Sequence, residues 1–458
     1  MAQAVEQENV LVTGKVPQTL VKFAGPYLLA CFLQTLYGMV DLYVVGRFND
    51  AATTSAVSIG SQVMHMLTVM IIGLAMGATV QIGHAFGGGD KRKASKITGI
   101  STLFFIALSF VAMVLLLLLT NPIVSVMMTP EEAVDETIAY LRICFIGIPF
   151  IMGYNVIAGI FRGAGDSVRP MYFAGVACLV NVVLDFALVG GLHMGATGAA
   201  LATVFGQAVS VLTALLYSRR NTVGFRLYKE DFTPKTAETS ALKGVLKVGF
   251  PISMQDGFIQ IAFIVITIIA NSRGLIDSAG VGIVEKMISF LFLVPSAFLS
   301  AISAMTAQNM GADKPERARK ALFVGIGITF TYGLLVFLMA QLWAAPLVGL
   351  FTKDAAVKLA GAAYFRSYSL DTAFAAIHFC FSGYFAGIGK SNYSFIHNLI
   401  SVVAVRVPGS YFASVLYPAT LLPMGLAAPA GSLLSCFICL GFYLHYQKKY
   451  QSQPAQVA

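Results

Sequence analysis

Long apolar runs recur along the whole chain, and they constrain its fold more than any other feature. A helix of about 20 apolar residues is long enough to cross the hydrocarbon core of a bilayer. Only 11% of the residues are charged, whereas a soluble domain usually carries about 25%. Twelve such runs are near residues 18–45, 53–84, 95–119, 133–160, 168–190, 196–218, 243–271, 279–308, 318–343, 355–384, 391–416 and 424–446. The sequence therefore predicts an all-α membrane protein with twelve transmembrane helices.

Lysine and arginine are unevenly distributed between the segments that join these runs. If the N-terminus is cytoplasmic, the outer segments hold only Arg47, Arg273, Lys353 and Lys358, and the inner segments hold nearly all the other basic residues. Cytoplasmic loops of membrane proteins carry an excess of Lys and Arg. We therefore expect a multi-pass protein of the cell (inner) membrane with both termini in the cytoplasm. The same bias explains the net charge of +9 without a nucleic-acid partner.

The two halves of the chain repeat each other. Four short segments recur in the same order: 20–26 with 245–251, 87–93 with 311–317, 161–167 with 385–391, and 194–195 with 424–425. Each half has six runs, so both halves enter the membrane from the same side, which is the arrangement of parallel transporter repeats. We predict an N-terminal lobe of residues 1–218, a cytoplasmic linker of residues 219–242 and a C-terminal lobe of residues 243–458. Substrate is expected in the cleft between the halves.

Polar residues inside the first run share one helical face. Gln34, Tyr37 and Asp41 are spaced i, i+3 and i+7. An ionisable group within a membrane span is costly and marks a functional site by default. The alternative is that Asp41 simply ends the helix at the water interface. Upstream, Pro26 removes a helical hydrogen bond and permits a kink, so we treat it as a candidate hinge.

Three further polar residues fall at the depth of Asp41 when 1.5 Å is allowed per helical residue. Asp185 lies near the outer end of the fifth run with Asn181 one turn earlier, and Thr203 lies two turns into the sixth run. Two carboxylates in a cavity of low dielectric disfavour double ionisation, and a proton or a Na⁺ ion relieves their repulsion. Further candidates that could line the same cavity are Tyr140, Asn155 and Gln207.

Several of these segments resemble the multidrug and toxic compound extrusion (MATE) family, and the prokaryotic branch that contains the DNA-damage-inducible transporters is the most similar. The segments that carry the resemblance are Pro26 to Asp41, Gly87-Gly-Gly-Asp90, Phe161-Arg-Gly-Ala-Gly-Asp166, Asn181-Val-Val-Leu-Asp185 and Met194 to Thr203. The resemblance implies two six-helix lobes, alternating access, and antiport of a substrate against H⁺ or Na⁺. It also implies a cation site at Asp41, Asn181, Asp185 and Thr203, with Tyr37 and Asn155 around the cavity.

The second half does not repeat the carboxylate pair. Val405 and Gly409 stand where the first half has Asn181 and Asp185. The candidate residues of the C-terminal lobe are Gln255, Glu285, Tyr368, Asp371 and His378. Tyr368 and Asp371 would share a face of an unbroken tenth helix with Tyr364. Pairing of the acids with Lys286 or Arg366 is the alternative to a functional role.

These observations favour multidrug efflux by antiport over other functions. We expect small lipophilic or cationic substrates, no cofactor and a monomer in the lipid bilayer. The alternative within transport is a lipid-linked saccharide or lipid flippase of the same superfamily. An integral membrane enzyme would need a catalytic motif, and the chain has no Gly-x-Ser-x-Gly, His-Glu-x-x-His or Walker sequence. A channel would need a repeated filter loop, whereas the repeated segments here are turns at the predicted cytoplasmic side.

Overall fold

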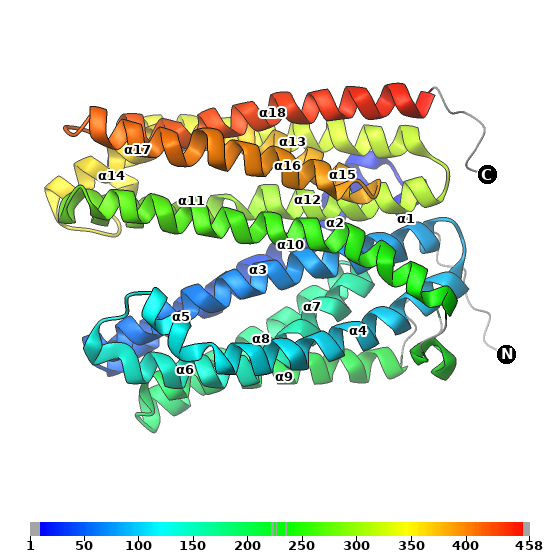
Figure 1. Cartoon of the computed structure of the whole chain (residues 1–458), viewed down its shortest axis with the longest axis horizontal. Helices are drawn as coiled ribbons and strands as arrows, with labels where there is room; N and C mark the ends of the chain where they lie inside the picture. The colour runs from blue at the N-terminus through cyan, green and yellow to red at the C-terminus, as the bar shows by residue number, and fades with distance from the viewer. Residues whose placement is uncertain (1–9, 221–223, 226, 234–235, 452–458) are drawn as a thin grey trace. The chain divides into compact units, whose positions relative to one another are not determined.

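The computed structural model describes residues 10–220, 224–225, 227–233 and 236–451, and these ranges are helical with short turns and no strand (Figure 1). The first half has α1 (Val10–Thr13), α2 (Val16–Phe48), α3 (Ala51–Gly87), α4 (Lys91–Leu118), α5 (Thr120–Val126), η1 (Glu131–Ala133), α6 (Val134–Ile146), α7 (Ile148–Gly163), α8 (Val168–Asp185), η2 (Phe186–Gly191) and α9 (Gly195–Arg220). After η3 (Lys229–Phe232) come α10 (Thr236–Asn271), α11 (Leu275–Leu291), α12 (Leu293–Gly311), α13 (Pro315–Val348), α14 (Ala355–Tyr368), α15 (Asp371–Gly387), α16 (Ser391–Ser401), η4 (Val402–Arg406), α17 (Val407–Leu416) and α18 (Leu422–Gln451). The all-α fold class is confirmed.

Each of the twelve predicted spans coincides with a helix or with consecutive helices. Within the described ranges, ten helices are long and apolar enough to cross a membrane, and α6 with α7 makes an eleventh span with a bend of 47°. The predicted tenth span is divided into α14 and α15, and neither half passes the same test. The expectation of an unbroken tenth helix was wrong, because the helix is interrupted at Ser369 and Leu370.

The chain divides into two compact units. The first contains residues 1–253 together with residues 307–314, and the second contains residues 254–306 and 315–458. The division falls inside α10, so the start of this helix packs with the first unit. The last turn of α12 does the same.

Four turns show that the two halves repeat in structure as well as in sequence. The residues after α3 and α12 that adopt left-handed conformations are Gly89 (φ +79°) and Asp313 (φ +54°), and Gly165 (φ +90°) and Gly389 (φ +73°) follow α7 and α15. In each turn, the residue after the left-handed one donates its amide hydrogen to the carbonyl oxygen five residues earlier, at 2.8–3.0 Å, and this bond closes the helix end. This is the Schellman closure, which needs one left-handed residue. The glycine-rich segments of the sequence are therefore helix terminators.

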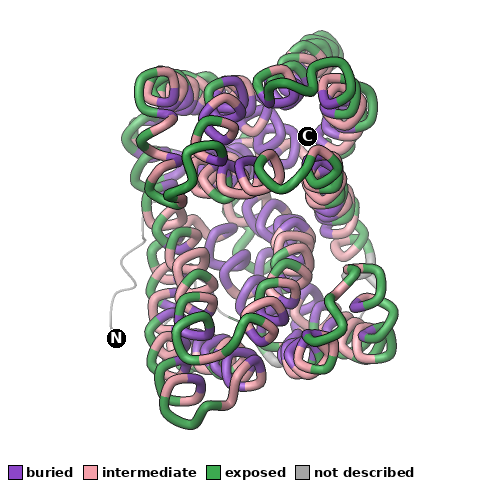
Figure 2. Tube along the Cα trace, turned by 90° about the vertical axis from the view of Figure 1, so that its left-hand side faces the viewer, coloured by how far each residue is buried: buried purple, intermediate pink, exposed green. Residues whose placement is uncertain are grey.

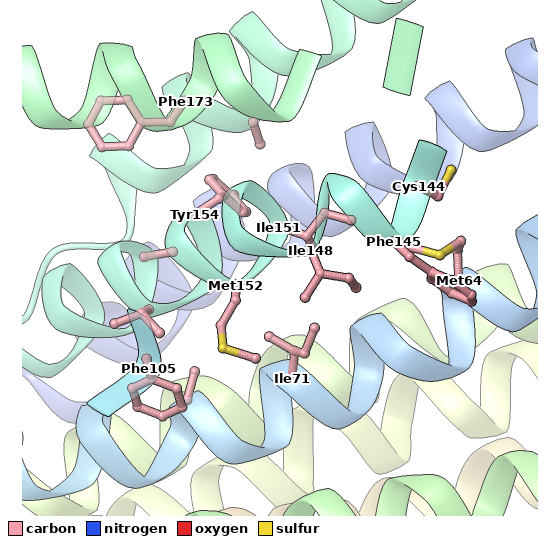
Figure 3. Packing of buried hydrophobic residues seen from close by; sticks show 14 of the residues in the cluster. Met64, Ile71, Phe105, Cys144, Phe145, Ile148, Ile151, Met152, Tyr154 and Phe173 are labelled. Carbon is pink, nitrogen blue, oxygen red and sulfur yellow. The ribbon is translucent and has the colours of Figure 1, made fainter. Parts of the chain in front are cut away.

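The core of the first unit lies between its helices and consists of aliphatic and aromatic side chains. Figure 3 shows Ile71 of α3 facing Ile148 and Met152 of α7, with Phe105 of α4 beside them. Figure 2 shows buried residues on the inward faces of the helices and exposed residues on their outer faces. Many of the exposed residues are large and apolar, for example Leu118 and Leu179, as is typical of helices that cross a bilayer.

Glycine allows α3 and the last turn of α12 to touch through their backbones. A Cβ atom at Gly87 would lie 2.0 Å from the carbonyl oxygen of Gln308, and one at Gly311 would lie 2.0 Å from that of His84. Nearby, Gln308 Nε2 donates to the Gly163 carbonyl at 2.8 Å. Larger residues would force the two helices apart.

The predicted linker is anchored where the structure describes it. The Asp231 side chain is fully buried, forms an ion pair with Arg92 at 2.7 Å and accepts a hydrogen bond from the Tyr228 amide at 2.9 Å. The Asp231 backbone also lies against Gly99 of α4, where a Cβ atom would come within 2.1 Å of the Asp231 carbonyl oxygen. The linker is thus attached to the N-terminal end of α4.

Candidate functional site

The first unit gathers four polar side chains from α2, α8 and α9. Asp41 of α2 and Asp185 of α8 are 2% and 0% exposed, and Asn181 is 2% exposed. Thr203 Oγ1 of α9 donates to Asp41 Oδ2 at 3.1 Å, and Asn181 Nδ2 donates to Thr203 Oγ1 at 3.5 Å. The Asp41 and Asp185 carboxyl groups are close enough to interact electrostatically. The structure therefore brings together the four residues that the sequence grouped.

Local features of α8 and α9 allow these two helices to pack closely at the site. A Cβ atom at Gly206 would lie 2.9 Å from the Ala177 carbonyl oxygen, so glycine lets α9 approach α8. Asp185 is the last residue of α8, and the π-helix η2 follows it directly. Single π-helical turns inside longer helices often occur at functional sites.

Three of the four carboxylate oxygens of the site lack donors in the described part of the chain. Four buried acceptors have no hydrogen-bond partner within the described ranges: Asp41 Oδ1, Asn181 Oδ1 and both carboxylate oxygens of Asp185. Buried polar atoms are almost always paired, and a buried carboxylate needs a partner even more. The contact between the two aspartates becomes a hydrogen bond only when one of them carries a proton.

The other candidates of the first unit lie around this site or apart from it. Gln207 Nε2 donates to the Tyr37 hydroxyl at 3.2 Å, one helical turn from the acid pair. Gln34, three residues before Tyr37 on α2, interacts with the side chain of Tyr154 on α7. Tyr140 instead hydrogen-bonds Ser61 of α3, with 3.1 Å between the hydroxyl oxygens.

Two of the first-unit candidates are engaged with backbone or lie in a regular helix. Asn155 Nδ2 donates to the Ile151 carbonyl of its own helix at 2.8 Å. The candidate hinge Pro26 lies inside α2, which continues through it from Val16 to Phe48. The helix is therefore continuous at Pro26 in this structure.

The second unit has a buried ion pair. Arg406 Nη2 lies 2.6 Å from Asp371 Oδ2, with the two side chains 12% and 0% exposed. The same nitrogen donates to Ser432 Oγ at 3.1 Å, and this hydroxyl also contacts His378 Nε2 at 3.3 Å. The acid is therefore already neutralised by a cation of the chain, and its partner is neither Lys286 nor Arg366.

Tyr368 and Glu285 lie in the same part of the second unit as Asp371, because Tyr368 interacts electrostatically with both acids. Glu285 accepts a hydrogen bond from Thr267 Oγ1 at 3.1 Å. Tyr368 packs against Tyr364, with ring centroids 5.5 Å apart. Gln255 is buried, and its Oε1 has no partner among the described residues.

Comparison with known proteins gives the family. The MatE family model matches the chain twice, over residues 26–187 and 251–412, which together are more than half of it. The chain belongs to the MatE family. The double match also confirms the internal repeat, and members of this family are transporters rather than enzymes. This MatE protein is thus a multi-pass membrane transporter.

Relatives of this MatE protein match most of its length. The probable multidrug resistance protein YoeA of Bacillus subtilis (strain 168) is 24% identical over 97% of this chain and 98% of its own length. The probable multidrug resistance protein NorM of Thermotoga maritima is 28% identical over 88% of each chain. The multidrug export protein MepA of Staphylococcus aureus (strain N315) is 23% identical over 77% of each.

Solved structures share the same fold. A crystal structure of a MATE protein in complex with MaL6 has a TM-score of 0.89 at 22% identity, covering 98% of this chain and 100% of the other. An MOP superfamily transporter from Pyrococcus furiosus, described with reversed polarity of its binding pocket, has a TM-score of 0.88 at 23% identity, covering 98% and 99%. At these identities the likeness establishes the fold of two repeated lobes.

The oxygen atoms of the first-unit site are of the kinds that bind a small hard cation. Carboxylate, amide and hydroxyl oxygens suit H⁺ or a cation that prefers oxygen, and four acceptor oxygens of this set lack donors. In the described part of the chain, no three His, Cys, Asp or Glu side chains form a cluster that could hold a metal ion.

Sequence reasoning missed part of the polar interior of this MatE protein. His397 of α16 lies close to His378, with ring centroids 5.5 Å apart, and its Nε2 contacts Ser382 Oγ at 3.0 Å. Arg162 of α7 is 3% exposed, although its segment, residues 161–167, is one of the turns placed at the predicted cytoplasmic side. The repeat held a signal that Arg162 is special, because the second half has Ala386 at the position of Arg162.

Proposed function

We propose that this MatE protein exports small lipophilic or cationic compounds by antiport against H⁺ or Na⁺, and that Asp41 and Asp185 bind the coupling cation. The observation that supports this proposal is the buried pair of carboxyl groups, three of whose four oxygens lack donors among the described residues. Two ionised carboxylates in such a place repel each other. One proton or one Na⁺ ion removes the repulsion, so the site has a physical reason to bind a single cation.

The surrounding side chains fit either ion. For a proton, the unprotonated aspartate becomes the acceptor for the protonated one, and Thr203 already donates to Asp41. For Na⁺, the unpartnered Asn181 Oδ1 adds a neutral ligand to the carboxylates. The printed names of the relatives, which are multidrug resistance and export proteins, support the same class of substrate.

Coupling needs a difference in affinity between conformations. A cation drives export only if it binds one state of the transporter better than another, or competes with the substrate for a site. We propose that the cation binds the N-terminal lobe from outside in an outward-facing state and favours substrate release. In this proposal the termini and the linker of residues 219–242 are cytoplasmic, and the lobes of residues 1–218 and 243–458 alternate access.

The test uses purified protein in vesicles with a fluorescent organic cation as substrate. A pH gradient or a Na⁺ gradient is imposed separately, and cation-driven transport is recorded. We expect one gradient to drive transport by the wild type, and Asp41→Asn and Asp185→Asn to abolish that dependence while the protein still folds. The matched control is Asp50→Asn, an exposed helix cap that keeps its capping function as asparagine. Full gradient-driven transport by Asp41→Asn would refute the proposal.

A further inference from the structure

One buried arginine of the first unit has no counter-charge among the described residues. Arg162, the penultimate residue of α7, is 3% exposed. Its Nε is buried without a hydrogen-bond partner, and the described residues supply no hydrogen bond or ion pair to the guanidinium. A buried charge needs a partner of opposite sign. Five arginines of the described chain, unlike Arg162, form an ion pair with a carboxylate: Arg92, Arg169, Arg273, Arg319 and Arg406.

The nearest acid along the chain is already engaged. Asp166 forms an ion pair with Arg169 and accepts hydrogen bonds from the Val168 and Arg169 amides at 2.9 and 3.1 Å. What Arg162 does contact is the ring of Tyr27 on α2, whose centroid is 4.9 Å from the guanidinium carbon. This cation–π contact holds the guanidinium in place but satisfies none of its five N–H donors.

The turn at this place does not require an arginine. The second half makes the same helix end and the same left-handed glycine turn after α15, where Ala386 stands at the position of Arg162. The arginine is therefore a feature of the first unit alone, like the acid pair. A planar guanidinium is the group that proteins use to bind carboxylates and phosphates through two parallel hydrogen bonds.

We propose that Arg162, held by Tyr27, is a binding site for an oxyanion, either a phosphate or a carboxylate group. The oxyanion would supply the missing negative charge and accept from the free guanidinium nitrogens. Two sources share this chemistry: the headgroup of an anionic lipid and a free anion. The site is distinct from the cation site, because Tyr27 and Asp41 are separated by fourteen residues of α2, about 21 Å along the helix.

The experiment measures binding to the purified full-length protein, so its outcome is independent of ion coupling. Thermal unfolding is followed while dioctanoyl phosphatidylglycerol, dioctanoyl phosphatidylcholine or inorganic phosphate is added. A ligand that binds the folded state raises the melting temperature with its concentration. We expect phosphatidylglycerol to raise it by several degrees in the wild type and to lose this effect in Arg162→Gln. Arg169→Gln is the matched control, because Arg169 lies at the same end of the unit, also over a tyrosine ring, but has its own carboxylate.

Each outcome decides something. Stabilisation by phosphatidylglycerol alone supports a lipid headgroup, and equal stabilisation by inorganic phosphate supports a free anion. If no anion stabilises the wild type, or if Arg162→Gln responds as the wild type does, the proposal is overturned. Should Arg162→Gln fail to fold, Tyr27→Leu and Tyr27→Phe replace it: Tyr27→Leu is expected to weaken the response and Tyr27→Phe, which keeps the ring, to retain it. An equal response of these two variants would count against the site.

Discussion

The Asp371–Arg406 ion pair of the second unit allows a prediction of stability in which the magnitude can be estimated. Replacing Arg406 with methionine removes the 2.6 Å contact and leaves a fully buried carboxylate whose other oxygen, Oδ1, already has no partner in the described chain. Removing one member of a buried ion pair costs about 3–5 kcal/mol. For a unit of roughly 200 residues, each kcal/mol lowers the melting temperature by about 2–4 °C. We therefore expect Arg406→Met to melt roughly 10 °C below the wild type.

The double variant separates the pair from its surroundings. Asp371→Leu with Arg406→Met removes both charges, and replacing both partners of a buried pair with apolar groups is often neutral. We expect it to melt within about 3 °C of the wild type. The control is Arg366→Met, because Arg366 is exposed on α14 of the same unit and a surface change has little effect. Melting is measured in detergent by the loss of the monodisperse peak in size-exclusion chromatography.

Two results would refute this reasoning. If Arg406→Met has the same melting temperature as the wild type, then loss of the ion pair does not destabilise the second unit. If the double variant is no more stable than Arg406→Met, then the loss comes from packing around Arg406. The packing alternative is specific, because a Cβ atom at Gly431 would lie 2.6 Å from Arg406 Cγ and the side chain fills that space.

Three further predictions follow from close contacts in the first unit. Gly87→Leu places a side chain on the Gln308 carbonyl and should reduce yield and melting temperature, because overpacking costs about 1–3 kcal/mol; Gly38→Ala, with nothing within 4 Å, should not. Asp231→Ala removes the buried anchor of the linker and should speed tryptic cleavage there by several-fold, whereas Glu230→Gln, whose side chain is 76% exposed, should leave cleavage unchanged; equal rates would show that the anchor does not hold the segment. Thr203→Ala removes the donor to Asp41 and should reduce gradient-driven transport without abolishing it; unchanged transport would exclude Thr203 from the site.

The sequence predicted the positions of the helices because length and hydropathy are local properties. Every apolar run became a helix or a pair of helices, and the glycine-rich repeats became left-handed turns at Gly89 and Gly165. The bend between α6 and α7 had a signal in Gly147 and Pro149, since proline favours the first turn of a new helix. The interruption at Ser369 and Leu370 had no such signal, because both residues keep helical dihedral angles.

Polar contacts were predictable in the first unit and not in the second. Asp41, Asn181 and Thr203 could be grouped because depth along straight helices is a matter of counting residues. Asp371 and Arg406 are 35 residues apart on different elements, and neither periodicity nor spacing connects them. Hydropathy likewise cannot show that an arginine such as Arg162 is buried.

The contrast between the two units carries a consequence for coupling. Both units repeat the same turns and the same family match, yet their buried charges differ. The first unit holds two carboxyl groups with no ion pair to a described residue, whereas the second holds one carboxylate with Arg406 against it. A site without its own cation must take one from solution, and a site that already has one has no such need. We infer that exchange of the coupling cation belongs to the first unit and that the second unit keeps its charge balance through the cycle.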